Sequence, residues 1–416
     1  MKFRIISTLA VLAMISASVI ISAEGYHPPT APPNSSPDEG TTSSSVSSGS
    51  IGGSFLHPAE DIYTPPLRAD GATNPNTYDW TFQNADVYDT MLSLGISEFK
   101  MSELADGYIP QGVAVYEAKK WLIVSSYHDS KKKNSILTIY DLTTGERVKT
   151  LYLQNKNGTD YIGHASGIAC TDNYLWMSVS YAVCAMPLWT IDEAEDGDCV
   201  QFFDQVKVPV IGSYLSISNG IMWVGEFYHP IDAVTKKDHV YTATDETVHY
   251  ALTVGYKLND EYFNELCEDY FDRTQVLAPD YALSVVDRIQ GFIQLPNGDF
   301  ALSQSYGRQA DSSIYFHSSP LNDKADGTFT VSGKKVPLWF LDGNNMRLSL
   351  QAPPMSEGIT AFDGKMYVVF ESGTKYYSEG IVNPTDSVWS LDLKRYEELT
   401  NKRVPVSNYY NPSDAI

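Results

Sequence analysis

Basic side chains are scarce in this chain of 416 residues: 29 lysines and arginines stand against 51 aspartates and glutamates, a formal net charge of −22. Binding of nucleic-acid phosphates needs a net basic face, so this balance argues against a nucleic-acid partner. The sequence also lacks a Gly-x-x-x-x-Gly-Lys-Ser/Thr loop, a His-Glu-x-x-His motif and a Gly-x-Ser-x-Gly nucleophile elbow. Phosphate-loop and serine-hydrolase functions therefore lose their usual sequence support.

Cysteine is also scarce. The four cysteines are Cys170, Cys184, Cys199 and Cys267. No two of them form a Cys-x-x-Cys pair, so the sequence does not indicate zinc or thioredoxin-type chemistry. One or two structural disulfides and buried free thiols are both consistent with this number. Hydrophobic residues make up 43% of the chain and aromatic residues 12%, which predicts a globular protein rather than a disordered one.

The one long apolar run stands at the start of the sequence. Lys2 and Arg4 precede a mainly apolar segment over residues 5–21, and the small residue Ala23 follows it. This order is typical of a secretory signal peptide, which we place at residues 1–23. An uncleaved anchor is the alternative, because a run of 17 residues is at the low end of what spans a bilayer. We expect a secreted or extracellular protein, either released or attached to the cell surface, with no other membrane insertion.

A low-complexity segment follows the apolar run. Proline, serine, threonine and glycine account for 21 of the 28 residues from His27 to Ser54. Such a stretch cannot bury enough apolar surface to offset the entropy lost on ordering. We therefore predict a disordered stalk over residues 24–76 and a folded domain over residues 77–416.

One pattern recurs five times in the folded domain. Each copy places an aromatic residue nine positions after its first anchor, at the start of a second strand-like segment. The pairs are Gly112 and Trp121, Gly167 and Trp176, Tyr214 and Trp223, Gly291 and Phe300, and Gly358 and Tyr367. Turn residues such as Pro296-Asn297-Gly298-Asp299 separate the two segments, which indicates a hairpin. The tryptophans share one repeat position, so we expect them to pack inside the repeats.

Further strand-like runs follow the hairpins, for example Ser135–Asp141. Four antiparallel strands per unit, repeated around a ring, form a β-propeller, so we predict an all-β propeller with five blades. The unit starts are 55, 47, 77 and 67 residues apart, and a sixth blade inside the 77-residue interval is the alternative. A β-sandwich is the competing fold, because its strands have similar spacing.

The longer intervals contain insertions. Lys257 to Asp280 is acidic and aromatic, and we expect it to be partly helical, whereas we expect a loop from Ser318 to Lys335. Residues 86–101 carry apolar side chains at helical spacing, namely Tyr88, Met91, Leu92 and Leu94. We expect this short N-terminal helical segment to pack beside the ring or to supply its closing strand.

Six segments between Gly107 and Leu393 resemble a family of exported bacterial propeller proteins whose activity is unassigned. They are Tyr108–Gly112, Gly163–Gly167, Trp223–Phe227, Ser303–Arg308, Pro353–Gly358 and Phe370–Gly373. The strand pattern is more loosely similar to gluconolactonase-type and apyrase-type calcium propellers, in which a metal sits on the central axis. Neither enzyme family's full ligand set is present in recognisable order, so the resemblance transfers no catalytic role.

Polar residues recur at one position of the repeat. The residue just before each first anchor is polar, and these residues are Gln111, Ser166, Ser213, Gln290 and Glu357. The first strand of each blade lines the central channel of a propeller, so we expect these side chains to meet at one mouth of the ring. Other polar residues lie close by or near the ends of the following strands; they include His164, Arg288, Tyr127, Glu226, Gln304, Tyr306, Arg308 and Glu371.

These residue types suit three kinds of site. Glu226, Glu357 and Glu371 are candidate ligands for calcium, a hard cation that prefers carboxylate oxygens. His164 and Glu357 are candidates for a general acid–base pair, because a partly buried mouth tunes both towards neutrality. The candidate ligand-binding residues are Gln111, His164, Gln290, Gln304 and Arg308. Arg288 and Arg308 are suited to clamp a carboxylate or phosphate. The competing interpretation is that these residues line a water-filled channel and bind nothing else.

Two functions are consistent with the sequence. The first is a secreted or surface-displayed propeller that binds a small molecule, a glycan or a peptide at its central mouth. The alternative is a calcium-dependent extracellular hydrolase or lactonase that uses the three glutamates and His164. Propellers support both kinds of function, so the fold does not decide between them. The sequence favours binding, because it contains no complete catalytic set.

Overall fold

The structure is a computed structural model that describes residues 85–378 and 381–401. The predicted signal peptide and stalk, residues 1–76, lie outside the described residues. The chain divides into the units Met1–Asp38 and Glu39–Ile416, and every described residue belongs to the second. Within the described ranges, no helix has the length and apolar character needed to cross a membrane.

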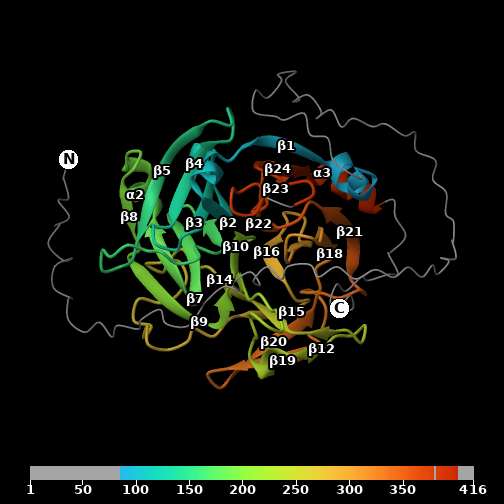
Figure 1. Ribbon diagram of the computed structural model, residues 1–416. Helices are drawn as coiled ribbons and strands as arrows, with labels where there is room; N and C mark the ends of the chain where they lie inside the picture. Colours follow the sequence, from blue (N-terminus) through green and yellow to red (C-terminus); the bar gives the residue numbers. More distant parts are fainter. Residues whose placement is uncertain (1–84, 379–380, 402–416) are drawn as a thin grey trace, which may run out of the picture. The chain divides into compact units, whose positions relative to one another are not determined.

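Five sheets surround a common centre, as Figure 1 shows. Their innermost strands are β2 (Tyr108–Tyr116), β6 (Ile168–Cys170), β10 (Tyr214–Ser218), β16 (Ile289–Gln294) and β22 (Ser356–Phe362). Each inner strand contacts the next in this order, and β22 returns to contact β2. The predicted five-bladed propeller is therefore confirmed, and the interval between the third and fourth repeats, which the structure describes throughout, contains no sixth blade.

Each blade continues outward from its inner strand by antiparallel pairing. Blade 1 adds β3 (Trp121–His128), β4 (Ile136–Asp141) and β5 (Arg147–Gln154), and blade 2 adds β7 (Tyr174–Pro187) and β9 (Asp204–Gly212). Blade 3 adds β11 (Ile221–Gly225), β14 (Ala251–Lys257) and β15 (Tyr281–Val285). Blade 4 adds β17 (Phe300–Gln304), β18 (Ser312–His317) and β21 (Met346–Ala352). Blade 5 adds β23 (Lys365–Phe370) and β24 (Ser387–Asp392).

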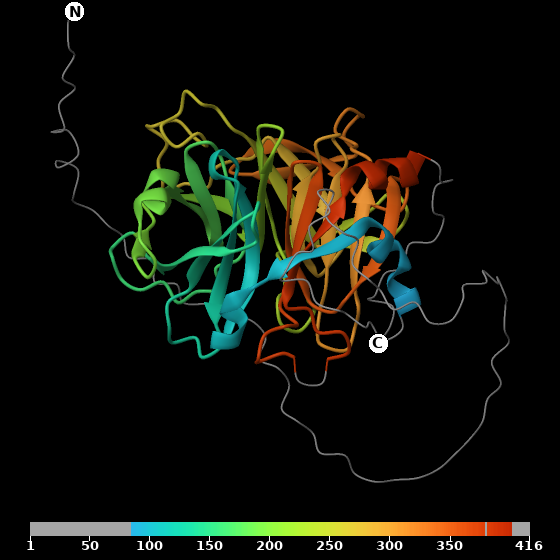
Figure 2. The same ribbon diagram turned by 90° about the horizontal axis from the view of Figure 1, so that it is seen from above.

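The N-terminal segment closes the ring. A 3₁₀ turn (Ala85–Tyr88) and helix α1 (Asp89–Leu94) lead into β1 (Gly95–Lys100), which pairs antiparallel with β24 and becomes the outer strand of blade 5. The helical spacing and the closing strand expected from residues 86–101 are both confirmed. In Figure 2 this strand runs along the ring towards blade 1.

The hydrophobic core is divided among five clusters, each between two adjacent blades. The cluster between blades 2 and 3, for example, joins Trp176 and Val183 to Met222 and Val224. Trp176 and Trp223 are fully buried, which confirms the expected packing for these two repeated tryptophans, whereas Trp121 is only half-buried at the edge of the cluster between blades 1 and 2. Burial of this kind contributes about 25 cal/mol per Å² of apolar surface, so the contacts between blades are a main source of stability.

The repeated anchor glycines are the points where inner strands approach one another. A Cβ on Gly112 would lie 2.4 Å from the Ser166 carbonyl oxygen, and one on Gly358 would lie 2.6 Å from that of Gln111. A Cβ on Gly167 would lie 1.8 Å from the backbone nitrogen of Leu215. These separations are far below van der Waals contact, so the repeat keeps glycine where the neighbouring backbone leaves no room for a side chain.

Blade 3 has Tyr214 instead of glycine at the anchor position. The Tyr214 ring lies over Gly225 on the next strand, where a Cβ would come within 2.1 Å of the ring. The hydroxyl hydrogen-bonds Thr253 Oγ1 at 2.7 Å and is thereby satisfied in the interior. Glycine at position 225 therefore compensates for tyrosine at position 214.

Segments inserted in one blade cover the outer edge of the preceding blade. Strand β8 (Cys199–Gln201), from blade 2, pairs parallel with β5 of blade 1. The hairpin of β19 (Gly327–Val331) and β20 (Lys334–Phe340), from blade 4, adds to β15 of blade 3 through β20. The expectation of a loop from Ser318 to Lys335 is therefore wrong over β19 and the first residues of β20, which pair with each other as a hairpin. Covered edges cannot pair with other chains.

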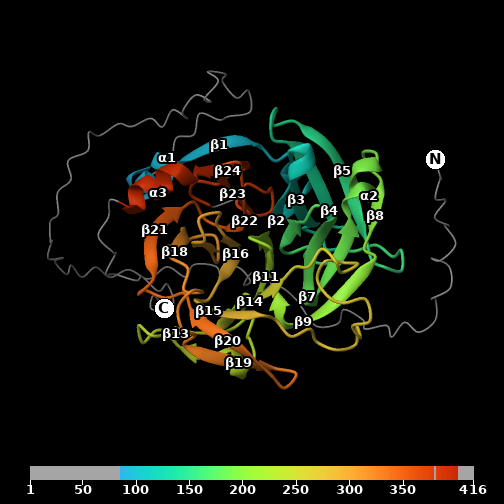
Figure 3. The ribbon, with the colours of Figure 1, turned by 180° about the vertical axis from the view of Figure 1, so that it is seen from behind.

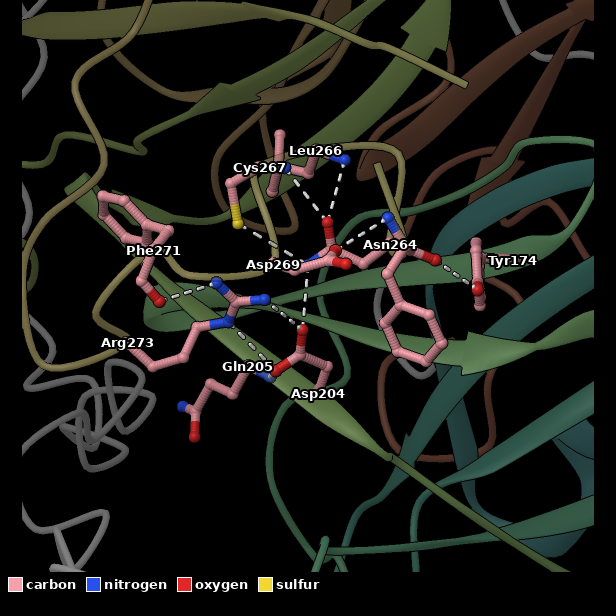
Figure 4. Close-up of polar contacts among 10 residues, drawn as sticks. Tyr174, Asp204, Gln205, Asn264, Leu266, Cys267, Asp269, Phe271 and Arg273 are labelled. Carbon is pink, nitrogen blue, oxygen red and sulfur yellow. Dashed lines mark hydrogen bonds and ion pairs between the residues drawn. The ribbon is translucent and has the colours of Figure 1, made fainter. Parts of the chain in front are cut away.

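The insertion at residues 258–280, from blade 3, covers blade 2. Leu277 donates its backbone N–H to Lys207 of β9 at 2.9 Å. Arg273 and Asn264 converge on the Asp204 carboxylate at 3.1 and 2.8 Å (Figure 4). The expected helix is absent from these described residues, since the segment consists of turns held by side chains.

Three short helices pack against the blades of the ring. Helix α2 (Leu188–Glu193) buries Leu188 and Ile191 against blades 1 and 2. Helix α3 (Leu393–Asn401) was not anticipated; it begins where the Asp392 carboxylate accepts the Arg395 N–H at 3.0 Å. It lies beside α1 in Figure 3. The remaining elements are 3₁₀ turns at Ser102–Asp106, Glu117–Lys119 and Lys237–His239, and the small hairpin of β12 (Tyr241–Thr242) and β13 (Val248–His249).

All four cysteines are free thiols, and disulfides are therefore not part of this fold. Cys184 and Cys267 are buried, Cys170 is half-buried and Cys199 is exposed.

Substitution of Gly167 by alanine tests the close approach of the inner strands. We expect Gly167→Ala to lower the free energy of unfolding by about 3 kcal/mol, because the new methyl group would overlap the backbone of β10. Gly327→Ala is the matched control, since its Cβ would meet only a Leu338 methyl group at 3.7 Å. Urea unfolding followed by circular dichroism measures both. Equal stability of the two variants would contradict the packing argument.

Candidate functional site

Three inner strands carry a β-bulge at the polar position that the repeat predicts. The antiparallel register slips at Gln111 in β2, at Gln290 in β16 and across Glu357 in β22. A bulge inserts an extra residue into one strand and re-aims its side chain, and bulges are frequent next to functional sites. The polar residue before the anchor is therefore set apart from the regular strand by the backbone itself.

Two buried glutamates lie side by side where blades 5 and 1 meet. Glu357 is on β22, and Glu371 directly follows the adjacent strand β23; they are 3% and 7% exposed. The Gln111 side chain, from β2, donates a hydrogen bond to Glu371 Oε1 at 2.5 Å. We call Gln111, Glu357, Glu371 and the two tyrosines described below the carboxyl site.

Burial favours the protonated form of both carboxyl groups. Burial, followed by the negative charge of Glu371, raises the pKa of Glu357 well above its ordinary range. Burial also raises the pKa of Glu371 to about 8, although the Gln111 hydrogen bond and the charge of Arg308 limit this rise. Since those two groups favour the ionised form of Glu371, Glu371 is the easier of the two carboxyl groups to ionise.

Two tyrosines flank the carboxyl groups. Tyr127 is near the end of β3, Tyr377 comes from the segment after β23, and their hydroxyl oxygens are 3.5 Å apart. Burial, followed by the charge of Glu371, raises the pKa of each hydroxyl far above its ordinary range. Both tyrosines therefore remain neutral donors. Figure 2 shows the segment after β23 projecting from one face of the ring.

His164 extends the site as an aromatic surface. Its ring stacks on Tyr127 with centroids 4.5 Å apart and planes inclined by 24°. Loss of hydration lowers the pKa of His164 to about 3, and the charge of Lys131 acts in the same direction. His164 is therefore neutral at pH 7, which suits hydrogen bonding and stacking rather than the donation of a proton.

Arg308 reaches the site from blade 4. Its guanidinium carbon is 5.0 Å from the ring centroid of Tyr377 and 5.4 Å from that of Tyr376, which is cation–π distance. Of the residues predicted from the sequence, the structure thus brings together Gln111, Glu357, Glu371 and Arg308, with His164 attached through Tyr127.

Glu226 lies apart from the other two glutamates. It is buried in blade 3, where its Oε1 is 2.7 Å from His239 Nδ1 and accepts the Leu252 N–H at 3.2 Å. Glu226 is three positions after its repeated aromatic residue, whereas Glu371 is four positions after its own. Successive side chains of a strand point to opposite faces, which separates the two glutamates. The grouping of three glutamates is therefore corrected to a pair.

The remaining predicted ligand-binding residues occupy blade 4. Gln304 is tied into the blade: its amide donates to the Asp287 carbonyl at 2.8 Å, and its oxygen accepts the Tyr315 hydroxyl at 2.8 Å. Gln290 is half-buried at its bulge. Neither makes a hydrogen bond to the carboxyl site among the described residues.

Calcium stays a prediction without a complete ligand set. Among residues 85–378 and 381–401, no three histidine, cysteine, aspartate or glutamate side chains form a group that could hold a metal ion. Glu357 and Glu371 offer two carboxyl groups, whereas calcium takes about six to eight oxygen ligands.

Tyr377 was not anticipated from the sequence. It lies outside the repeated hairpin, in the connection between the second and third strands of blade 5, whose length differs from that in the other blades, so no periodic signal marks it. The alternation of side chains along the second strand, in contrast, would have separated Glu226 from Glu371 from sequence alone.

The chain matches no family model and no curated protein. Among solved structures it is similar to Myxococcus xanthus glutaminyl cyclase, at 12% identity and a TM-score of 0.35 over 69% of this chain and 92% of that chain. It is also similar to the PQQ-bound aldose sugar dehydrogenase of Streptomyces coelicolor, at 11% identity and a TM-score of 0.35 over 68% and 93%. These low values support no inference about activity or ligand.

The carboxyl pair predicts how stability changes with pH. Both glutamates have a higher pKa in the folded protein than the ordinary value of 4.5. Their contribution to the free energy of unfolding is therefore complete below pH 4.5. It is lost as the pH rises through the pKa values of the folded protein, which is about 8 for Glu371. We expect the free energy of unfolding of Glu357→Gln to fall less steeply with pH, by up to about 1.4 kcal/mol per pH unit. The substitution removes one titrating carboxyl group and its repulsion with Glu371. Chemical unfolding across the pH range measures the slope.

Glu398→Gln provides the control for this experiment. Glu398 is exposed on α3, and the substitution changes the net charge by the same amount. We expect its stability to follow that of the unsubstituted protein at every pH. Parallel curves for all three proteins would mean that the carboxyl pair does not titrate in this range.

Proposed function

We propose that this chain is an exported propeller that binds a glycan at its central mouth, at the carboxyl site. The predicted signal peptide at residues 1–23 and the stalk at residues 24–76 support export and display on or beyond a cell surface. The observation that carries the proposal is the buried pair of Glu357 and Glu371, which costs stability at neutral pH. Ionisable groups in such surroundings are typical of functional sites.

The hydrogen-bonding capacity of the pair matches a hydroxyl-bearing ligand. A protonated Glu357 presents a donor and an acceptor, and Glu371 presents acceptors. A sugar hydroxyl is likewise both a donor and an acceptor, so it can satisfy both carboxyl groups at once. Among the described residues, no hydrogen bond offsets the rise in the Glu357 pKa, which leaves this carboxyl able to bind a ligand.

The aromatic residues supply the second component of sugar recognition. His164 and Tyr127 form one stacked surface, and Tyr377 faces Tyr127 across 3.5 Å between hydroxyls. Neutral aromatic rings have an apolar face and a polar edge, which suits the C–H face and hydroxyl rim of a sugar ring. Peptides and other small molecules remain the alternative ligands proposed from the sequence.

Glycan binding is tested with a glycan array followed by calorimetric titration of the best-bound oligosaccharide. We expect Glu357→Gln to weaken binding by about tenfold or more, because the carboxyl donor and its coupling to Glu371 are lost while the shape is kept. Glu398→Gln should bind as the unsubstituted protein does. An array without a bound glycan, or a glycan whose affinity is indifferent to Glu357→Gln, would defeat the proposal.

A second candidate function is hydrolysis by general acid–base catalysis. It is favoured by one observation: a carboxyl group that favours its protonated form lies beside one that ionises more readily. Two such groups serve as acid and base in many hydrolases. This differs from the calcium-dependent hydrolase or lactonase considered from the sequence, because the proton transfer is assigned to the pair alone.

Turnover separates the two candidates. The hydrolase candidate predicts release of nitrophenol from aryl glycosides or opening of sugar lactones, loss of at least about a hundredfold in kcat/KM in Glu371→Gln, and a rate indifferent to EDTA. A rate that falls in EDTA and returns with calcium would instead support the predicted calcium site. Absence of turnover with a ligand that binds would leave binding as the function.

A further inference from the structure

A second polar cluster lies at the same end of the inner strands and is not used by the carboxyl site. It consists of His229, Asp232, Asp287, Arg288 and Tyr306, and we call it the Arg288 cluster. Arg288 precedes β16, Tyr306 follows β17 and His229 follows β11, so the cluster occupies the junction of blades 3 and 4. The carboxyl site occupies the junction of blades 5 and 1.

The Arg288 guanidinium is held without adequate partners. Its Nε is buried and has no hydrogen-bond partner among the described residues. The nearest counter-charge is Asp287 Oδ2, 3.6 Å from Nε, which is beyond hydrogen-bond distance. A guanidinium carries five N–H donors, and a buried donor without a partner costs free energy. Arg288 is therefore a cation whose outer donors are available to a ligand.

The backbone fixes where this side chain begins. Arg288 donates its N–H to Tyr228 at 3.2 Å, accepts the Ser305 N–H at 3.1 Å, and has a φ of +59°. Met355 in blade 5 has a φ of +65° and accepts the Glu371 N–H at 3.0 Å in the same manner. The left-handed conformation thus belongs to the fold, whereas the arginine is particular to blade 4.

An aromatic stack positions the guanidinium. Its carbon is 5.7 Å from the Tyr306 ring centroid, and that ring stacks on His229 at 4.0 Å. The Tyr306 hydroxyl donates to Asp232 at 2.5 Å, which fixes the ring. The Arg288 side chain is 17% exposed, so it is positioned before a ligand arrives and is still accessible. Such preorganisation lowers the entropic cost of binding.

We propose that Arg288 binds the carboxylate of an acidic ligand at this mouth. A carboxylate fits the planar fork of a guanidinium with two parallel hydrogen bonds. A single negative charge is preferred to a phosphate dianion, because the carboxylates of Asp287 and Asp232 already lie beside the site. Where the ligand is the proposed glycan, this inference rests on the proposed function and makes that glycan an acidic one, of the uronic-acid type.

The loop from Ser305 to Asp311 connects the two sites. Tyr306 faces the Arg288 cluster, while Arg308 contacts Tyr377 at the carboxyl site. One loop of blade 4 thus contributes to both clusters.

The anion site is tested first with acetate, independently of any sugar. The Arg288 Nε–H resonance of the ¹⁵N-arginine-labelled protein is assigned by its loss in Arg288→Lys and followed during titration with sodium acetate at constant ionic strength. We expect a saturable shift in the millimolar range, with the exposed Arg395 resonance unmoved and the same response in Glu357→Gln. No saturable shift, or equal shifts at both arginines, would overturn the proposal.

A matched set of sugars tests the chemical class. Glucuronate, glucose and glucose 6-phosphate share one ring and differ at the sixth carbon, so calorimetric titration compares a carboxylate, a hydroxyl and a phosphate. We expect glucuronate to bind about tenfold more tightly than either of the others, and Arg288→Gln to abolish this preference. Arg288→Lys, which keeps the charge but not the fork, should be intermediate.

The two tests separate the failure of this inference from that of the proposed function. Saturable acetate binding at Arg288 without sugar binding would support the anion site and count against the glycan. Sugar binding without preference for glucuronate, or a preference that survives Arg288→Gln, would overturn the assignment to Arg288. Tighter binding of glucose 6-phosphate would show that the site takes phosphate rather than carboxylate.

Discussion

The close approach of five inner strands is the constraint on which the rest of this molecule depends. At Gly112, Gly167, Gly291 and Gly358, the next strand lies where a side chain would otherwise stand. This contact narrows the centre of the ring and fixes the angle between blades, so the apolar clusters between blades can close. It also fixes where the bulges fall, because each bulge directly precedes an anchor glycine. Packing and the placement of polar side chains are thus consequences of one repeated contact.

The fold was predictable because the repeat records that contact in the sequence. Glycine and an aromatic residue nine positions later correspond to the inner strand and the start of the second strand, and five copies gave five blades. The covering segments were not predictable: β8, β20 and residues 258–280 pair with a blade to which they do not belong by sequence. Their local patterns carry no information about that partner, and side-chain contacts such as Arg273 with Asp204 replaced the expected helix.

The candidate site was predictable in part. The polar residue before the anchor placed Gln111 and Glu357 at one mouth, and Glu371 joined them from the neighbouring strand. Glu226 did not join them, because its position relative to the repeated aromatic residue differs by one from that of Glu371, and side chains alternate along a strand. Its partner His239 comes from a connection that no sequence pattern positions. Tyr377 likewise comes from an irregular connection. Repeats therefore identify residues on strands, whereas residues supplied by connections require the structure.

The overlap of each blade with its predecessor has a consequence for biosynthesis. Strands β5, β9 and β15 gain their outer partners only after part of the following blade has left the ribosome, and β24 pairs with β1, the first of the described strands. Blades 1 to 3 are therefore completed only while the next blade is being made, and β1 has no strand partner until β24 emerges. Until then the unpaired edges of a nascent chain are open to aggregation, and a chain that stops before β24 leaves the ring unclosed.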